Sequence, residues 1–293
     1  MNDLVAIYRA AQTKLRSKLY SIDITEFQKW RTEQVLTQIN AIIRELNLQA
    51  RSWAKGSMGK IYDSGVDLAG EQLRKLRVTT EVDKFSRIHT AAIDVLMDNT
   101  SLDLLSANDS MAKTIGRYIR TTQQRLIEDQ RISDLIAQGI IEGETRRTVS
   151  DSLLKEFGKR MEEAEFITIN GRNYEPRKYA ELVARTRGLE ASNQAAINTA
   201  LQYGVDLVQV SVHSGACERC EAIQGKIYSI SGTSKDFPAL STIQVPVHPH
   251  CRHVLLPVTA IALRQRGTFE ELSRLSMGTS PITSVADLAM ELA

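Results

Sequence analysis

The chain has 293 residues, enough for two domains and a substantial core. Its 25% charged and 42% hydrophobic residues are typical of a soluble globular protein, and a net charge of +2 is too small to indicate nucleic acid as an obligatory partner. It contains no apolar run near the roughly 20 residues of a membrane span. The first residues lack a secretory h-region and there are only three cysteines, so we expect a reducing compartment such as a cytoplasm.

The first 175 residues contain no proline and are rich in helix-forming residues. This composition predicts a mainly helical region over residues 1–165. Asp23 and Glu26 have the spacing of a capping box at the start of a helix. The residues expected along one face of that helix are Phe27, Trp30, Gln34, Ile39, Ile42, Leu46 and Trp53. Further helices are expected at 2–20, 59–76, 80–98, 110–138 and 144–163, with turns at 98–101, 106–110 and 139–144.

Charge in this region is nearly balanced. Residues 1–160 contain 25 Lys and Arg against 21 Asp and Glu, interleaved along the helices. The pattern favours a solvated surface of packed helices over a track for DNA. His89, the only histidine of the region, is expected on a helix surface or in the core.

Shorter elements follow from residue 166. A strand at 166–169 leads into Asn170-Gly171, a dipeptide typical of tight hairpin turns. Pro176 fits the first turn of a helix, and Gly204 is placed to end it.

Three further strands are expected, at 206–213, 226–230 and 254–258. The sequence therefore predicts an α+β fold: the helical region, then a small α+β module at 166–258 with a short antiparallel sheet. Residues 259–293 are expected to form a tail that is helical or partly disordered.

All three cysteines and four of the five histidines lie between His213 and His253. Cys217 and Cys220 form a C-x-x-C pair, and His248 and Cys251 form a second pair with the same spacing. Two such pairs can supply the four N/S ligands of a zinc ion. We therefore predict a structural zinc site of Cys217, Cys220, His248 and Cys251, with His253 and His213 as alternates for the fourth ligand.

Other interpretations of the cysteines remain open. They are reduced cysteines without metal, a redox pair, a Cys217–Cys220 disulfide, and a catalytic zinc with Glu218 or Glu221 nearby. A redox pair normally precedes a helix in a thioredoxin-like unit, whereas Gly225 and a strand follow here. Neither H-E-x-x-H nor the zinc-deaminase signature occurs, so we predict no catalytic residues.

The motifs Y-A-E-L-V-A-R-T-R, C-E-R-C, Q-G-K-I-Y-S-I-S-G and H-P-H-C-R-H-V-L-L-P-V occur in this order over about 170–258. In them the chain resembles the tailed-phage minor capsid proteins of the minor capsid protein 2 group, which are related to the Mu F-like head morphogenesis proteins. The family's Cys-x-x-Cys falls on Cys217 and Cys220, and its His-Pro-x-Cys-Arg on His248, Cys251 and Arg252. Glu218 stands where the family often has proline, which leaves the ligand spacing unchanged.

The resemblance implies a low-copy structural protein of the virion, made in the cytoplasm of an infected or lysogenic host. It implies head assembly near the portal, with the portal or major capsid protein as partners, DNA inside the head as a further candidate, and no membrane. Because the catalytic zinc motifs are absent from the sequence, we expect that the protein is not an enzyme. Two alternatives are kept: a metal-dependent hydrolase or nuclease, such as a phage-delivered effector, and a DNA-contacting packaging or ejection factor.

Overall fold

The computed structural model describes residues 2–20, 29–128 and 167–266. They form two compact units. The helical unit contains the described residues of 2–52 and 102–180, and the sheet unit contains those of 53–101 and 181–293.

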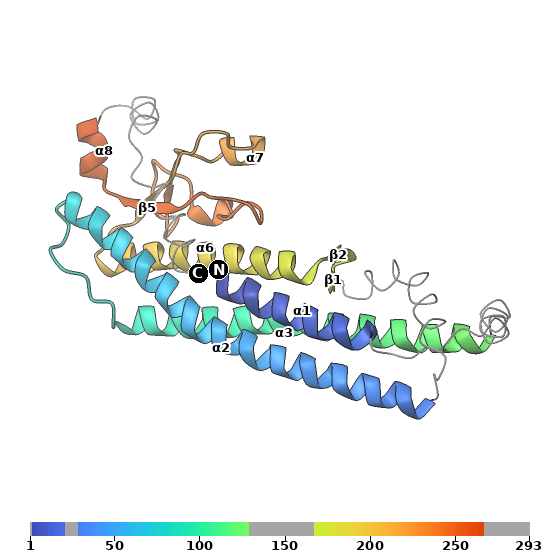
Figure 1. Cartoon of the computed structure of the whole chain (residues 1–293). Coiled ribbons are helices and arrows are strands. Elements are labelled where there is room, and N and C mark those ends of the chain that lie inside the picture. Colours follow the sequence, from blue (N-terminus) through green and yellow to red (C-terminus); the bar gives the residue numbers. More distant parts are fainter. Residues whose placement is uncertain (1, 21–28, 129–166, 267–293) are drawn as a thin grey trace. The chain divides into compact units, whose positions relative to one another are not determined.

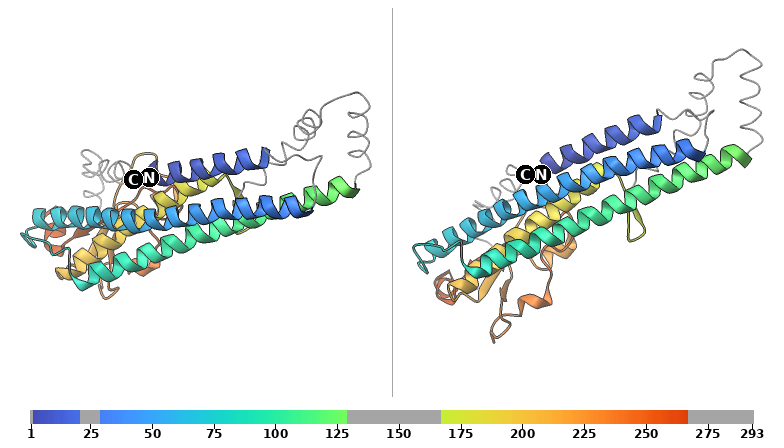
Figure 2. Two further views of the ribbon diagram at one scale, coloured as in Figure 1. Left: turned by 60° about the horizontal axis from the view of Figure 1, so that its bottom comes forward. Right: turned by 90° about the horizontal axis from the view of Figure 1, so that it is seen from below.

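The helical unit is built from α1 (Asn2–Tyr20), the first part of α2 (Lys29–Lys75) and the later part of α3 (Arg87–Glu128). These long helices are seen from three sides in Figures 1 and 2. Apolar residues recur every three or four positions on each helix, which places them on one face. The buried members are Leu4, Tyr8, Ala11, Leu15 and Leu19 of α1, Leu36, Ile39, Ile43, Leu46 and Ala50 of α2, and Leu104, Ala107, Met111, Ile115 and Ile119 of α3.

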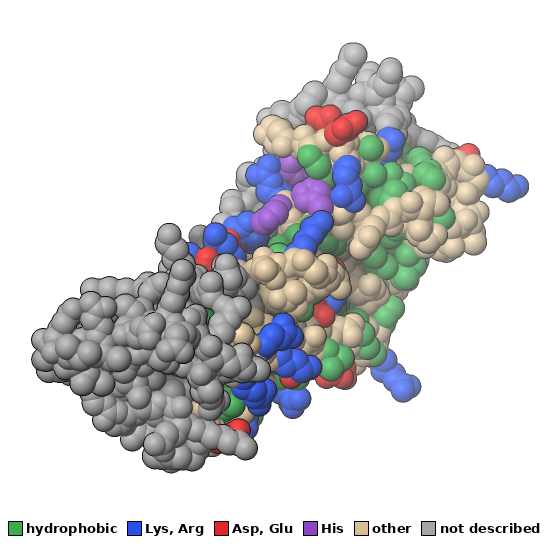
Figure 3. All heavy atoms as spheres, turned by 90° about the vertical axis from the view of Figure 1, so that its right-hand side faces the viewer, with side chains coloured by type: hydrophobic (Ala, Val, Ile, Leu, Met, Phe, Trp, Pro, Cys, Tyr) green, Lys and Arg blue, Asp and Glu red, His purple; other side chains and the backbone are tan. Residues whose placement is uncertain are grey.

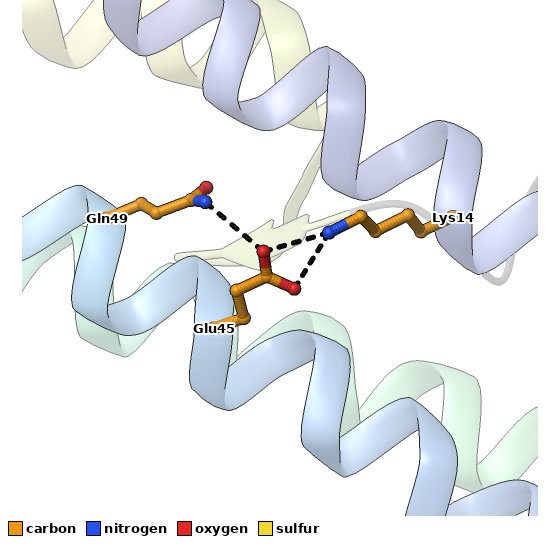
Figure 4. Close-up of polar contacts among 3 residues, drawn as sticks. All are labelled: Lys14, Glu45 and Gln49. Atoms are coloured by element: carbon orange, nitrogen blue, oxygen red, sulfur yellow. Dashed lines mark hydrogen bonds and ion pairs between the residues drawn. The ribbon is translucent and has the colours of Figure 1, made fainter.

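Polar contacts connect these helices, one set of them buried and another nearer the surface. The buried Tyr8 hydroxyl donates to Asn108 Oδ1 at 2.8 Å, and Asn108 Nδ2 donates to Asn47 Oδ1 at 2.7 Å. Nearer the surface, Lys14 Nζ lies 2.8 Å from both carboxylate oxygens of Glu45, which also accepts from Gln49 (Figure 4). The buried bonds of Asn108 determine how the buried faces of the three helices pair. The ion pair of Lys14 with Glu45 is about half exposed to solvent.

A short hairpin completes the helical unit. Strands β1 (Ile167–Ile169) and β2 (Arg172–Tyr174) pair antiparallel around Asn170-Gly171. Both turn residues have positive φ, 49° and 74°, as the favoured two-residue hairpin turns require. The predicted strand, over its described residues, and the predicted Asn170-Gly171 turn are therefore confirmed.

The sheet unit places three short antiparallel strands in the order β4-β3-β5. Its core joins Val208, Val210, Tyr228 and Leu255 of the sheet to Ala69 of α2 and Ala196 of α6. Figure 1 shows the orange β5 beside the yellow α6. The elements are α6 (Pro176–Gln202), β3 (Leu207–Val210), α7 (Glu218–Glu221), β4 (Ile227–Ser229), the 3-10 helix η2 (Leu240–Thr242), β5 (Leu255–Val258) and α8 (Ala260–Arg266).

A buried polar chain ties the helices of the sheet unit together. The Tyr62 hydroxyl lies 2.9 Å from His89 Nδ1 and accepts from Asn198 Nδ2 at 2.7 Å. His89 Nε2 lies 2.8 Å from Gln202 Oε1. His89 is thus a fully buried core residue with both ring nitrogens hydrogen-bonded.

The α+β fold class predicted from the sequence is confirmed. The helix at 2–20, the start of α6 at Pro176 and its end before Gly204 are also as predicted. None of the helices in the described part of the chain has the length and hydropathy of a membrane span.

Two predicted turns, at 98–101 and 106–110, are wrong because α3 continues through both. Polar residues suggested a break there, but Thr100 Oγ1 donates to the Leu96 carbonyl and Asn108 bonds to neighbouring helices. The helix expected from residue 80 begins only at Arg87. The helix expected through Trp53 and the one expected at 59–76 are joined in one continuous helix, α2, over Lys29–Lys75.

Several predictions lie outside the described residues. They are the Asp23–Glu26 capping box, the helix at 144–163, the turn at 139–144 and the tail beyond residue 266. The domain boundaries at 165 and 258 stay predictions.

Candidate metal centre

Two tight turns position the cysteines. Cys217 precedes the short helix α7, and its carbonyl accepts the backbone N–H groups of Cys220 and Glu221, both at 2.8 Å. In the second turn the N–H of Cys251 donates to the carbonyl of His248 at 2.9 Å. Each turn brings residues i and i+3 together, as the sequence spacing predicts.

The turns bring their sulfur and nitrogen atoms close together. His248 Nε2 lies 3.4 Å from Cys217 Sγ and 3.2 Å from Cys220 Sγ. Cys220 Sγ lies 4.0 Å from Cys251 Sγ, which lies 3.5 Å from His253 Nδ1. The atoms form two groups of three that share Cys220, and within each group all ligand atoms lie within 4.8 Å.

These separations fit a metal ion bound by sulfur and nitrogen. Zinc–sulfur bonds of about 2.3 Å and zinc–nitrogen bonds of about 2.0–2.1 Å place tetrahedral ligand atoms roughly 3.5–3.8 Å apart. All three cysteines are free thiols, so no disulfide competes for them. The Cys/His cluster could therefore hold a metal ion.

The two cysteines of the C-x-x-C pair differ in environment. Cys217 is exposed, and the backbone N–H of Cys220 lowers its pKa, helped by the nearby Arg219. Cys220 is buried, and burial together with the neighbouring sulfurs raises its pKa to about 12. Burial disfavours the negatively charged thiolate form of Cys220. A bound metal cation would supply a positive charge that stabilises this thiolate.

His253 and His213 form the inner side of the cluster. His253 is buried, and burial, with nearby cationic groups, lowers its pKa to about 4. Its Nε2 lies 3.3 Å from Gln224 Oε1, and its ring packs edge-on against His213 with centroids 4.9 Å apart. His213 Nε2 bonds to Ser211 Oγ at 2.9 Å, and His213 belongs to neither three-ligand group.

The cluster is anchored to α6 and to the sheet. Asn193 of α6 accepts the N–H of Leu255 at 2.9 Å and donates to the carbonyl of His253 at 3.5 Å. Thr186, also of α6, donates to the Pro249 carbonyl at 3.5 Å. Sequence reasoning assigned no role at the cluster to Asn193 or to Gln224, the first residue of the motif Q-G-K-I-Y-S-I-S-G, because their contacts with His253 depend on the folded loops.

The outer side of the cluster faces solvent. Figure 3 shows histidine side chains at the surface among Lys and Arg side chains. Arg219 donates to the Val247 carbonyl at 3.0 Å and Arg252 to the Ser214 carbonyl at 3.4 Å, so both span the cluster's loops. The positive charges of these two arginines can offset the negative charge of cysteine thiolates.

Glu218 and Glu221, the carboxylates closest in sequence, are exposed. Among the described residues, no Asp or Glu joins either three-ligand group. The donor set is thus one of sulfur and nitrogen, as structural zinc sites use.

The family model described as phage minor capsid protein 2 matches residues 1–261, a range that includes the whole cluster and nearly all described residues. No curated protein and no solved structure matches the chain.

Proposed function

Because the chain belongs to the phage minor capsid protein 2 family, we propose that it acts in head assembly near the portal, with a zinc ion that stabilises its sheet unit. Family membership makes it a bacteriophage minor capsid protein with a structural role in the virion. It also bears out the resemblance seen over 170–258 and extends it to the helical region.

One observation carries the zinc proposal: two i,i+3 turns from separate loops place three cysteines and two histidines in overlapping three-ligand groups. The proposed ligands are Cys217, Cys220, Cys251 and one histidine. Sequence spacing favours His248, and His253 is the other histidine within reach.

The proposed zinc would act as a staple. It would join the loop between β3 and β4, which carries Cys217 and Cys220, to the loop between β4 and β5, which carries His248 and Cys251. The strands have only three or four residues each, so they offer few ladder bonds to order such loops. A metal that binds the folded loops and not the unfolded ones adds its binding free energy to folding.

Metal content and thiol reactivity test the zinc site. On protein purified without chelator, we expect about one zinc per chain by mass spectrometry, with all three thiols protected until chelator is added. Re-addition of zinc after chelation should restore protection. An absence of metal together with three freely reactive thiols would refute the site and leave the family assignment intact.

The place in the head is tested on particles. Cross-linking mass spectrometry of purified virions should detect the protein at low copy number, with cross-links to the portal protein. Cross-links to the major capsid protein alone would contradict the location near the portal.

A further inference from the structure

The hydrogen bonds around the two candidate histidines differ, and this difference determines which histidine is ready to bind metal. A neutral imidazole carries one N–H and one nitrogen lone pair. Only the nitrogen with the lone pair can bind a metal, and the partner of the other nitrogen fixes which one it is.

For His253 the partner is the side chain of Gln224. Gln224 Oε1 accepts the backbone N–H of His213 at 3.2 Å, which identifies this atom as the amide oxygen. An oxygen can only accept, so His253 Nε2, at 3.3 Å from it, carries the hydrogen. The lone pair of His253 is therefore on Nδ1, which faces Cys251 Sγ at 3.5 Å.

For His248 the assignment is the reverse. The backbone N–H of His250 donates to His248 Nδ1 at 3.2 Å, so the lone pair is on Nδ1. Nε2 then carries the hydrogen and points it at the sulfurs of Cys220 and Cys217, at 3.2 and 3.4 Å. Metal binding through Nε2 would put a hydrogen on Nδ1 and abolish the bond from His250.

We infer that His253, through Nδ1, is the histidine ligand of the zinc, beside Cys220 and Cys251 of its own three-ligand group and Cys217 of the other group. His248 is a positioning residue whose Nε2–H donates to the thiolates of Cys217 and Cys220. Three thiolates around Zn²⁺ leave a net negative charge, which such N–H donors stabilise. Gln224 fixes the ring of His253 from outside the metal's ligand shell. This inference rests on the proposed zinc site and reverses the choice that sequence spacing favours.

Cadmium NMR tests the assignment on the unaltered full-length chain. With ¹¹³Cd in place of zinc, a ¹¹³Cd–¹H correlation spectrum should connect the metal to the β-protons of all three cysteines and to the ring protons of His253. Correlations to the ring of His248 and none to His253 would overturn the inference while supporting the zinc site. A protein that binds neither cadmium nor zinc would instead refute the proposed site itself.

Matched variants give a second readout. His253→Ala should weaken zinc binding by more than about 100-fold and alter the Co²⁺ absorption spectrum, because a ligand is lost. His248→Gln should weaken it by about 10- to 100-fold, as loss of an outer hydrogen bond does, and leave the Co²⁺ spectrum unchanged. His250→Gln, at an exposed histidine outside both groups, should change neither. A Co²⁺ spectrum altered by His248→Gln but not by His253→Ala would reverse the assignment.

Discussion

The helical unit and the sheet unit are stabilised by different means. Each long helix of the helical unit buries a continuous apolar stripe, and its interhelical polar contacts supplement a core that packing already provides. The sheet unit has three strands of three or four residues, and 25 residues separate Ser229, the end of β4, from Leu255, the start of β5. Loops of that length with little regular structure are uncommon in compact domains, so we expect specific cross-links to help order this one. The comparison indicates that single polar or ligating residues matter more in the sheet unit than in the helical unit.

The largest expected effect is that of Cys220→Ser. Cys220 belongs to both three-ligand groups, so its loss should abolish tight metal binding. We expect the free energy of unfolding to fall by about 4 kcal/mol or more, in the range of losing a structural metal. Thermal unfolding and metal content measured on the same sample check this.

The matched control for Cys220→Ser is His250→Gln in the neighbouring turn, which should keep both metal and stability. If Cys220→Ser kept wild-type stability and metal content, the proposal of a structural zinc site would be wrong.

Asp206→Asn should have the next largest effect. Burial opposes ionisation of this carboxyl, but hydrogen bonds from Ser229 and Ser231 outweigh it and hold the pKa of Asp206 below its ordinary value. Its oxygens accept from Ser229 Oγ at 2.5 Å and from the backbone N–H of Ser231 at 2.7 Å. Replacing the charged acceptor should cost about 1.5–3 kcal/mol in urea unfolding at neutral pH.

The pH dependence gives the control for Asp206. Because the pKa of Asp206 is lower in the folded than in the unfolded chain, its carboxylate stabilises the fold at pH values above the unfolded-chain pKa of about 3.9. This stabilisation is lost as the pH falls through the pKa of Asp206 in the folded chain. The difference between wild type and Asp206→Asn should therefore narrow below about pH 4. A difference that stayed constant down to pH 3 would show that the carboxylate charge is not the cause.

Gly65→Ala tests the contact of α2 with α6 in the sheet unit. A Cβ at Gly65 would lie 2.8 Å from Ala195 Cβ and 2.9 Å from the Ser192 carbonyl oxygen, so backbone would have to shift. We expect a loss of about 1–3 kcal/mol. Gly56→Ala, on the same helix with open space around it, should instead stabilise by up to about 1 kcal/mol. Equal effects of the two substitutions would contradict the close contact.

The smallest effect is expected from Lys14→Ala in the helical unit. The ion pair with Glu45 is about half exposed, with side-chain exposures of 51% and 49%. Solvent screening limits such pairs to under about 1 kcal/mol. A double-mutant cycle with Glu45→Gln, repeated at high salt, measures the coupling. If the Lys14–Glu45 coupling free energy were as large as the loss of stability caused by Asp206→Asn, single polar residues would matter equally in the two units, contrary to our expectation.

Features fixed by neighbouring residues could be predicted from the sequence. The Asn170-Gly171 turn, the helix start at Pro176 and the two i,i+3 turns that carry Cys217 with Cys220 and His248 with Cys251 all follow from local rules. These rules failed at Asn108, where a residue typical of turns lies inside α3 because Tyr8 and Asn47 satisfy its side chain. Tertiary contacts there outweigh intrinsic preference.

The candidate site shows the same limit. The sequence spacing predicted that Cys217, Cys220, His248 and Cys251 lie close together. It could not determine whether His248 or His253 is the histidine ligand. That choice depends on the Gln224 oxygen and the His250 backbone N–H, whose positions follow from the folded loops.

Hydrogen exchange with and without chelator tests the central claim most directly, that a metal orders the sheet unit's loops. If the claim is right, removing zinc lowers the protection of backbone amides within 211–258 and leaves that of 2–20, 29–52 and 102–120 unchanged. Restoring zinc should restore the protection. Protection within 211–258 that is the same with and without metal would contradict the claim, because the loops would then be ordered by packing alone.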